Sequence, residues 1–211
     1  MNNIKSILQS GLQTMNINLS VPQQLQLLAF VDLLKKWNSI YNLTALRDET
    51  SVISHHILDS LTLLPYVQDA RGLIDVGSGG GMPGIPIAIA RPDLPVALLD
   101  ANSKKTAFLQ QAVIELGLNN VQVITARVEA MVGEHFDVIT SRAFAELADF
   151  VNITKQLMAD GGMWAAMKGV HPYEEIAQLP NTVEVLSVDK LNVPGLNAER
   201  HMVLMRKKDM I

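Results

Sequence analysis

Apolar positions in the first third of the chain recur at helical spacing. They predict a helix over residues 21–37, with Ser20 as its N-cap and Pro22 in its first turn. The polar stretch 38–47 interrupts this spacing, which then resumes over 55–67. We therefore expect residues 1–70 to form a helical N-terminal extension, packed on a core made by residues 71–211.

Short apolar runs alternate with helical patterns in the remainder of the chain. The runs predict five buried strands, over 73–76, 96–100, 121–125, 136–141 and 163–167. Helices are expected between them, over 85–90, from an N-cap at Ser103 to Leu116, and over 147–158. Two further strands, at 183–188 and 201–205, are expected as an antiparallel edge pair. This order is typical of an α/β fold with a mostly parallel sheet and right-handed crossovers.

A glycine-rich turn joins the first of these strands to its helix. Four of the five residues after Val76 are glycines, and Pro83 follows where a first helical turn would begin. Missing side chains let a ligand approach the backbone, and glycine permits the positive φ angles of a tight turn. The segment therefore predicts a nucleotide-binding turn, and the alternative is a surface turn that binds nothing.

Two carboxylates narrow the choice of ligand. Asp75 lies on the strand and is expected to organise the loop or to reach the charged end of a ligand. Asp100 ends the next strand about 20 residues after the glycines, where a carboxylate binds both ribose hydroxyls of a nucleoside. NAD and S-adenosylmethionine both fit these features.

The glycine spacing separates these two cofactors. Counted from Gly77, Met82 replaces the third glycine of a dinucleotide loop, and a match that starts at Gly79 begins two residues late. The aspartate-led, glycine-crowded loop resembles motif I of class I S-adenosylmethionine-dependent methyltransferases. The loop therefore favours a methyltransferase over a dehydrogenase.

Composition limits the class of protein. With 211 residues, of which 48% are hydrophobic and 18% charged, the chain can bury one sizeable core. It has no cysteine, hence no disulfide or thiolate metal site, and no secretory or membrane-spanning segment is expected. These features suit a cytoplasmic protein. A net charge of −4 argues against a protein that coats naked nucleic acid, so any RNA contact is expected to be local.

Ligand-binding residues are expected just after the strands, because ligands bind beyond the carboxyl ends of parallel strands. Val128 and Glu129 are placed to contact an adenine edge, although Glu129 also suits an ordinary exposed acid. Arg142 directly follows a buried strand and requires an anion, which is a ligand carboxylate, a phosphate or Asp75. Lys168 is placed similarly. The five histidines are scattered, so no metal site is expected.

Several segments carry a resemblance to one family. They are Trp37 to Thr44, His56-Ile57-Leu58-Asp59-Ser60, Ile74 to Pro86, Ser141-Arg142-Ala143-Phe144, Lys168-Gly169 and Glu199-Arg200-His201. Together they resemble the bacterial small-subunit ribosomal RNA methyltransferase G family, also called glucose-inhibited division protein B. The resemblance covers nearly the whole chain and implies a Rossmann-like class I methyltransferase. By this resemblance the cofactor contacts are Gly77, Met82, Val128, Glu129 and Arg142, and Gly80 departs from the proline of many relatives.

The same resemblance implies methyl transfer from S-adenosylmethionine to N7 of one guanine in the 530 loop of 16S rRNA. Guanine N7 carries no proton, so no general base is expected and positioning supplies most of the acceleration. We expect Arg142 and Lys168 to bind the RNA or orient guanine O6, and a ring such as Phe144 or a side chain of the helical N-terminal extension to stack on the base. The alternatives are a sensor that binds S-adenosylmethionine without turnover and an NAD-dependent oxidoreductase.

The acidic balance also bears on the partner. We expect a monomer that acts on a small ribosomal subunit or an assembly intermediate rather than on stripped 16S rRNA, without a membrane partner. Candidate phosphate contacts are the basic residues Lys35, Lys36, Arg47, Lys104, Lys105, Arg200, Arg206, Lys207 and Lys208.

Overall fold

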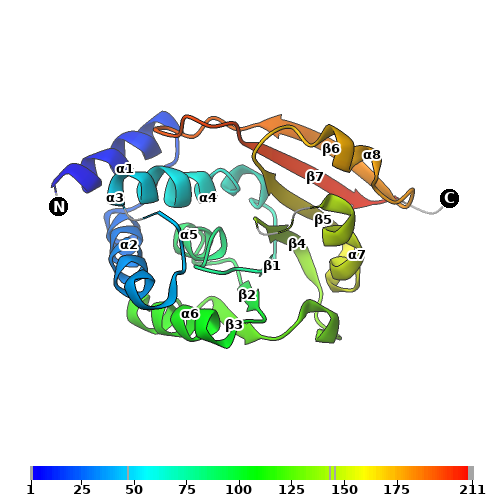
Figure 1. Cartoon of the computed structure of the whole chain (residues 1–211), viewed down its shortest axis with the longest axis horizontal. Helices are drawn as coiled ribbons and strands as arrows, with labels where there is room; N and C mark the ends of the chain where they lie inside the picture. Colours follow the sequence, from blue (N-terminus) through cyan, green and yellow to red (C-terminus); the bar gives the residue numbers. More distant parts are fainter. Residues whose placement is uncertain (1, 47, 143, 145, 209–211) are drawn as a thin grey trace.

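A seven-stranded sheet forms the centre of the molecule, as a computed structural model shows (Figure 1). The structure describes residues 2–46, 48–142, 144 and 146–208, so Arg47 and Ala143 lie outside it. The strand order is β3-β2-β1-β4-β5-β7-β6. The strands are β1 (Leu73–Val76), β2 (Val96–Asp100), β3 (Val121–Thr125), β4 (Phe136–Ser141), β5 (Met158–Lys168), β6 (Val183–Lys190) and β7 (His201–Lys207).

The direction of the strands confirms the predicted fold class. β1 to β5 are parallel to one another, and β7 is antiparallel to both β5 and β6. The expected antiparallel edge pair is therefore present. The last strand of the chain inserts between β5 and β6 and leaves β6 at the edge.

Helices before the sheet fill the first part of the chain. They are α1 (Asn2–Thr14), α2 (Val21–Tyr41), α3 (Glu49–Val52), the π-helix η1 (Ile53–Leu58), α4 (Asp59–Leu61) and the 3₁₀ turn η2 (Leu64–Tyr66). Ser20 caps α2 as predicted, because its side chain accepts from the Gln23 N–H while Gln23 returns a contact to the Ser20 N–H. The division of the chain near residue 70 stays a prediction, since these helices share one apolar core with the sheet.

The remaining helices cover the two faces of the sheet. They are α5 (Gly84–Ala90), α6 (Ser103–Leu116), η3 (Val128–Ala130), α7 (Leu147–Thr154), η4 (Lys155–Leu157) and α8 (Tyr173–Ala177). Successive strand residues enter opposite cores: Leu73 belongs to the core that contains residues of α1 to α6, whereas Ile74 belongs to the core that contains residues of α7 and α8. Among the described residues, no helix has both the length and the hydropathy of a membrane span.

Several sequence expectations differ from the structure. The helix expected over 147–158 ends as α7 at Thr154, and the 3₁₀ turn η4 follows it to Leu157. Asn102, not Ser103, is the N-cap of α6, because its carboxamide accepts from the N–H groups of Lys104 and Lys105. β5 begins at Met158 rather than 163, and the glycines at 161 and 162 lie inside it, with Gly161 at φ 73°. From the sequence, these two glycines suggest that the strand begins after them, whereas β5 continues through both. α1 and α8 were not individually predicted.

Candidate functional site

The carboxyl ends of β1 to β4 meet around a cavity of about 210 Å³, which we call the first cavity. Parallel strands place their carboxyl ends at one edge of the sheet, so loops far apart in sequence converge there. The four expected post-strand positions all contribute to it. Its lining consists of Val76, Gly77, Leu99, Asp100, Ala101, Ala126, Arg127, Val128, Glu129, Phe144 and Ile153.

The glycine loop turns sharply at the end of β1. Gly77, Gly79 and Gly81 have φ angles of 73°, 58° and 87°, which residues with a Cβ rarely adopt. The N–H groups of Gly77 and Ser78 both donate to the carbonyl of Leu99 on β2. The loop is thereby held against the neighbouring strand, with its backbone at the first cavity.

Asp75 supports the loop from inside the protein. Its Oδ2 accepts from the Gly84 N–H at 2.9 Å, and its side chain is fully buried. Burial raises the pKa of Asp75 to about 7, although the Gly84 N–H and the Arg142 charge oppose the rise. The structure thus shows Asp75 joining the end of β1 to the first turn of α5.

Asp100 binds the loop from the side of the first cavity. Its Oδ2 accepts from the Gly79 N–H at 3.0 Å, and its Oδ1 accepts from the Asn102 N–H at 2.8 Å. Lys105 Nζ lies 3.9 Å from Oδ2. These contacts hold the carboxylate at the cavity, and each of its oxygens keeps a further lone pair for a hydroxyl group.

The other predicted cofactor residues separate into two groups. Gly77, Val128 and Glu129 line the first cavity, where Val128 is buried and Glu129 is exposed. Met82 is buried in the core beneath the loop, 5% exposed. Phe144 lines the same cavity and packs against Phe150, with ring centroids 5.3 Å apart.

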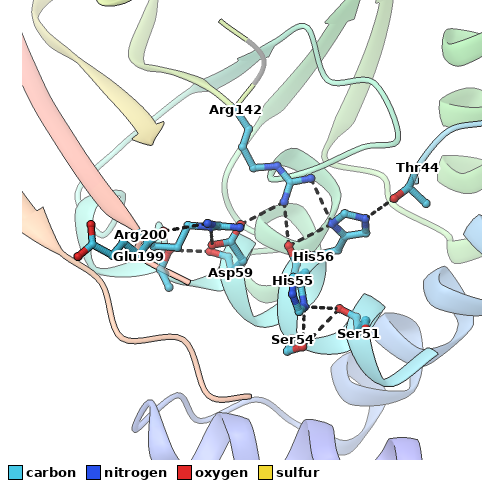
Figure 2. A network of polar contacts seen from close by, with 10 residues as sticks. Thr44, Ser51, Ser54, His55, His56, Asp59, Arg142, Glu199 and Arg200 are labelled. Atoms are coloured by element: carbon cyan, nitrogen blue, oxygen red, sulfur yellow. Dashed lines mark hydrogen bonds and ion pairs between the residues drawn. The ribbon is translucent and has the colours of Figure 1, made fainter. Parts of the chain in front are cut away.

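Arg142 lies at a second cavity, of about 350 Å³. Its Nη1 donates to Asp59 Oδ2 at 3.2 Å and to the His55 carbonyl at 3.1 Å. Arg200 Nε donates to the other oxygen of Asp59 at 3.1 Å (Figure 2). The second cavity is lined by Leu46, His55, His56, Asp59, Arg142, Met167, Lys168, Gly169 and Arg200.

The anion that contacts Arg142 within the chain is therefore Asp59. Of the three candidates weighed from sequence, Asp75 is not the ion-pair partner, although it feels the Arg142 charge. Burial raises the pKa of Asp59, and the guanidinium groups of Arg142 and Arg200 oppose that rise. Sequence reasoning missed this pair, although an acid inside the apolar run 57–64 signals a buried partner.

His56 connects Arg142 to the helical segment. Its Nε2 lies 2.6 Å from Thr44 Oγ1, and its Nδ1 lies 3.4 Å from Arg142 Nη2. Burial and, after it, the Arg142 charge lower the pKa of His56 to about 4. The ring is therefore neutral near pH 7, so it adds no charge to the second cavity.

Lys168 links the two cavities. Its Nζ lies 2.6 Å from Glu175 Oε2 and donates to the Phe144 carbonyl at 3.2 Å. Glu175 also accepts from the Leu147 N–H at 2.9 Å. A residue that lines the second cavity, Lys168, thus contacts a residue that lines the first, Phe144.

Comparison with known proteins relates this site to one family. Residues 23–203 match the family described as rRNA small subunit methyltransferase G. A Ribosomal RNA small subunit methyltransferase G of Neisseria meningitidis serogroup C is 62% identical over 204 residues, covering 97% of this chain and 99% of that protein. A protein of the same name from Laribacter hongkongensis is 59% identical, covering 95% and 97%.

Solved structures of more distant proteins share the fold. An O-methyltransferase from Bacillus cereus in complex with SAH has a TM-score of 0.59 at 20% identity, over 85% of this chain and 91% of that chain. A ribosomal protein L11 methylase from Lactobacillus delbrueckii subsp. bulgaricus has a TM-score of 0.57 at 16% identity, over 72% and 77%. At these identities the likeness shows the fold alone.

Proposed function

Because the chain belongs to the rRNA small subunit methyltransferase G family, we propose that it methylates N7 of a guanine in the 530 loop of 16S rRNA, with S-adenosylmethionine as methyl donor. One observation carries the proposal beyond family membership. A cavity with nucleoside-binding features and a second, cationic cavity are joined through the hydrogen bond between Lys168, which lines the second, and Phe144, which lines the first. This arrangement suits a donor and an acceptor held side by side.

The first cavity fits the donor. Gly77 and Gly79 keep side chains away from the space beside the loop, and Asp100 offers lone pairs for two ribose hydroxyls. Val128 and Glu129 suit an adenine, since one is apolar and the other accepts hydrogen bonds from an amino group. Asp75 and Met82 support the loop from below, and the donor supplies an electrophilic methyl group when bound.

The residues of the second cavity suit a guanine acceptor. Guanine N7 has a lone pair and no proton, so the protein needs to orient the base rather than to remove a proton. Arg142 and Lys168 are the proposed catalytic residues, because both carry N–H donors and line the second cavity. Either donor suits guanine O6, which lies beside N7 on the same base edge.

The net charge bears on the form of the RNA. A net charge of −4 disfavours binding to a bare polyanion, so a folded particle that offers further contacts is the better substrate. We therefore propose the small ribosomal subunit or an assembly intermediate as acceptor, and the cytoplasm as the place of reaction.

The test is methyl transfer from labelled S-adenosylmethionine to small subunits that lack the modification, with free 16S rRNA in parallel. The expected product is 7-methylguanosine, identified by mass after nuclease digestion, with faster transfer to the particle. Donor binding in calorimetry without label on either RNA would instead indicate a different acceptor or a sensor. Hydride transfer with NAD would identify an oxidoreductase.

A further inference from the structure

The second cavity carries more positive than negative charge. Among the described residues that line it, Asp59 has the only carboxylate, whereas Arg142, Lys168 and Arg200 are cations. Glu175 neutralises Lys168 from outside the lining. One carboxylate cannot neutralise two guanidinium groups, so at least one positive charge remains at the cavity.

Asp59 holds these two arginines side by side. Its side chain is 1% exposed, and each of its oxygens contacts a different guanidinium group, as Figure 2 shows. The Arg142 and Arg200 side chains are each 25% exposed. Arg200 uses Nε for Asp59 and Nη1 for the Glu199 carbonyl. Among the described residues, none accepts a hydrogen bond from its Nη2.

A half-buried arginine with a surplus charge and a remaining donor suits an anion with several oxygens. Of the two reactants, RNA carries such a group at every nucleotide. Resting on the proposed function, we propose that Arg200 binds a phosphate diester of the acceptor RNA in the second cavity. Asp59 is then a positioning residue that fixes Arg200 beside Arg142.

The two residues have different expected signatures. Loss of Arg200 removes an RNA contact and one positive charge. RNA binding is then expected to be weaker and to depend less steeply on the salt concentration. Loss of the Asp59 charge leaves both cations in place, so attraction for RNA persists while their geometry is lost. Asp59→Asn is therefore expected to lower kcat without raising KM for RNA, with kcat calculated per chain that binds S-adenosylmethionine, because a loss of folded protein alone would also lower the apparent kcat at constant KM.

The experiment compares Arg200→Gln, Arg200→Lys and Arg71→Gln with the wild-type chain. Arg71 precedes β1 and pairs with Asp137, so it lies at the amino ends of the parallel strands, away from the second cavity. Its loss removes the same unit of charge without changing that cavity. kcat and KM for small subunits are measured over a series of salt concentrations. Calorimetry gives the Kd for S-adenosylmethionine.

For Arg200→Gln, we expect KM for RNA to rise about tenfold and the salt slope to fall by about one. Arg71→Gln is expected to behave as wild type, and Arg200→Lys is expected to restore the slope. Equal effects of Arg200→Gln and Arg71→Gln would overturn the inference. So would a weaker Kd for S-adenosylmethionine with KM for RNA unchanged, because Arg200 would then bind the donor carboxylate.

Two further readouts complete the test. Asp59→Asn with unchanged kcat would overturn the positioning role, and the Arg200 variants carry the test if that buried substitution prevents folding. If wild type transfers no methyl group, the proposed function fails by itself. Binding of a single-stranded guanosine oligonucleotide to wild type and Arg200→Gln then still tests the phosphate contact, with equal affinities overturning it.

Discussion

Asp75 on β1 accepts a hydrogen bond from the N–H of Gly84, and the two residues are packed so closely that no side chain fits on Gly84. A Cβ there would lie 2.9 Å from Asp75 Oδ2 and would overlap Leu98 Cδ2. The first turn of α5 is therefore held directly against the strand that precedes the glycine loop.

Gly84→Ala is expected to destabilise the fold by about 2 kcal/mol, because the added methyl group overpacks a buried contact. It should also weaken S-adenosylmethionine binding, because a displacement of β1 also displaces the glycine loop that comes directly after it. Denaturant unfolding and calorimetry measure the two effects. The matched control is Gly72→Ala, where the nearest atom to a Cβ is Phe136 Cδ1 at 3.8 Å. Equal stability of both variants would contradict the prediction.

Asp100→Asn is expected to raise the Kd for S-adenosylmethionine about 10- to 100-fold, because charge-assisted hydrogen bonds to ribose hydroxyls are lost. The amide retains one acceptor oxygen for the two backbone N–H groups that Asp100 now binds. Calorimetry measures the change. Asp93→Asn, at an exposed acid that pairs with Arg91, should leave the Kd unchanged. An unaltered Kd for Asp100→Asn would show that this carboxylate does not bind the ribose.

Arg142→Ala is expected to lower methyl transfer about 100-fold, the usual cost of losing one donor to a reacting group. The fold should persist, because Asp59 keeps its ion pair with Arg200. Methyl-transfer rates are measured beside thermal unfolding and donor affinity. Wild-type turnover in a folded variant would exclude Arg142 from catalysis.

Lys168→Met and Glu175→Gln separate a chemical from a structural role of Lys168. Both substitutions break the Lys168–Glu175 ion pair, but only the first removes the cation from the second cavity. We expect at least a tenfold larger loss of kcat for Lys168→Met, because only that variant loses the donor to the base. Equal losses of kcat would mean that Lys168 has only a structural role, in which it holds Glu175 and the Phe144 carbonyl in place.

His56 makes stability depend on pH. Its folded pKa of about 4 lies below the ordinary value of 6.5, so the unfolded chain binds the proton first and stability falls as pH drops from 6.5 to 4. At pH 5 this loss is about 2 kcal/mol. Asp75, with a pKa raised to about 7, acts in the opposite direction over the same range.

His56→Gln should therefore lose less stability than wild type between pH 7 and pH 5, by about that amount. Denaturant unfolding at the two pH values checks it, and the Asp75 contribution cancels because both chains contain it. His135→Gln, at an exposed position, should keep the wild-type difference. The same pH dependence in His56→Gln would show that another group causes the loss.

Sequence patterns predicted the sheet because its signals are local. Buried runs such as Val96 to Asp100, and the glycine loop after Val76, are readable without knowing what packs on them. The first cavity followed from the rule that parallel strands end together. α1 was missed because Asn, Gln and Ser surround the few residues that it buries, Leu8 among them.

The second cavity depends on partners that no local pattern connects. Asp59 meets Arg142 and Arg200 across 83 and 141 positions of sequence. An arginine directly after a buried strand indicates that an anion lies nearby. Here the anion is Asp59 of α4, a helix that is far from β4 in the sequence. Only the fold identifies which acid that is.

The position of β7 has a consequence for how the protein is made. Arg200 directly precedes this strand, which enters the sheet between β5 and β6 although it is the last strand in the chain. During synthesis the glycine loop, Asp100 and Asp59 leave the ribosome well before Arg200. All lining residues of the first cavity, up to Ile153, are therefore synthesised before Arg200 becomes available to complete the second cavity.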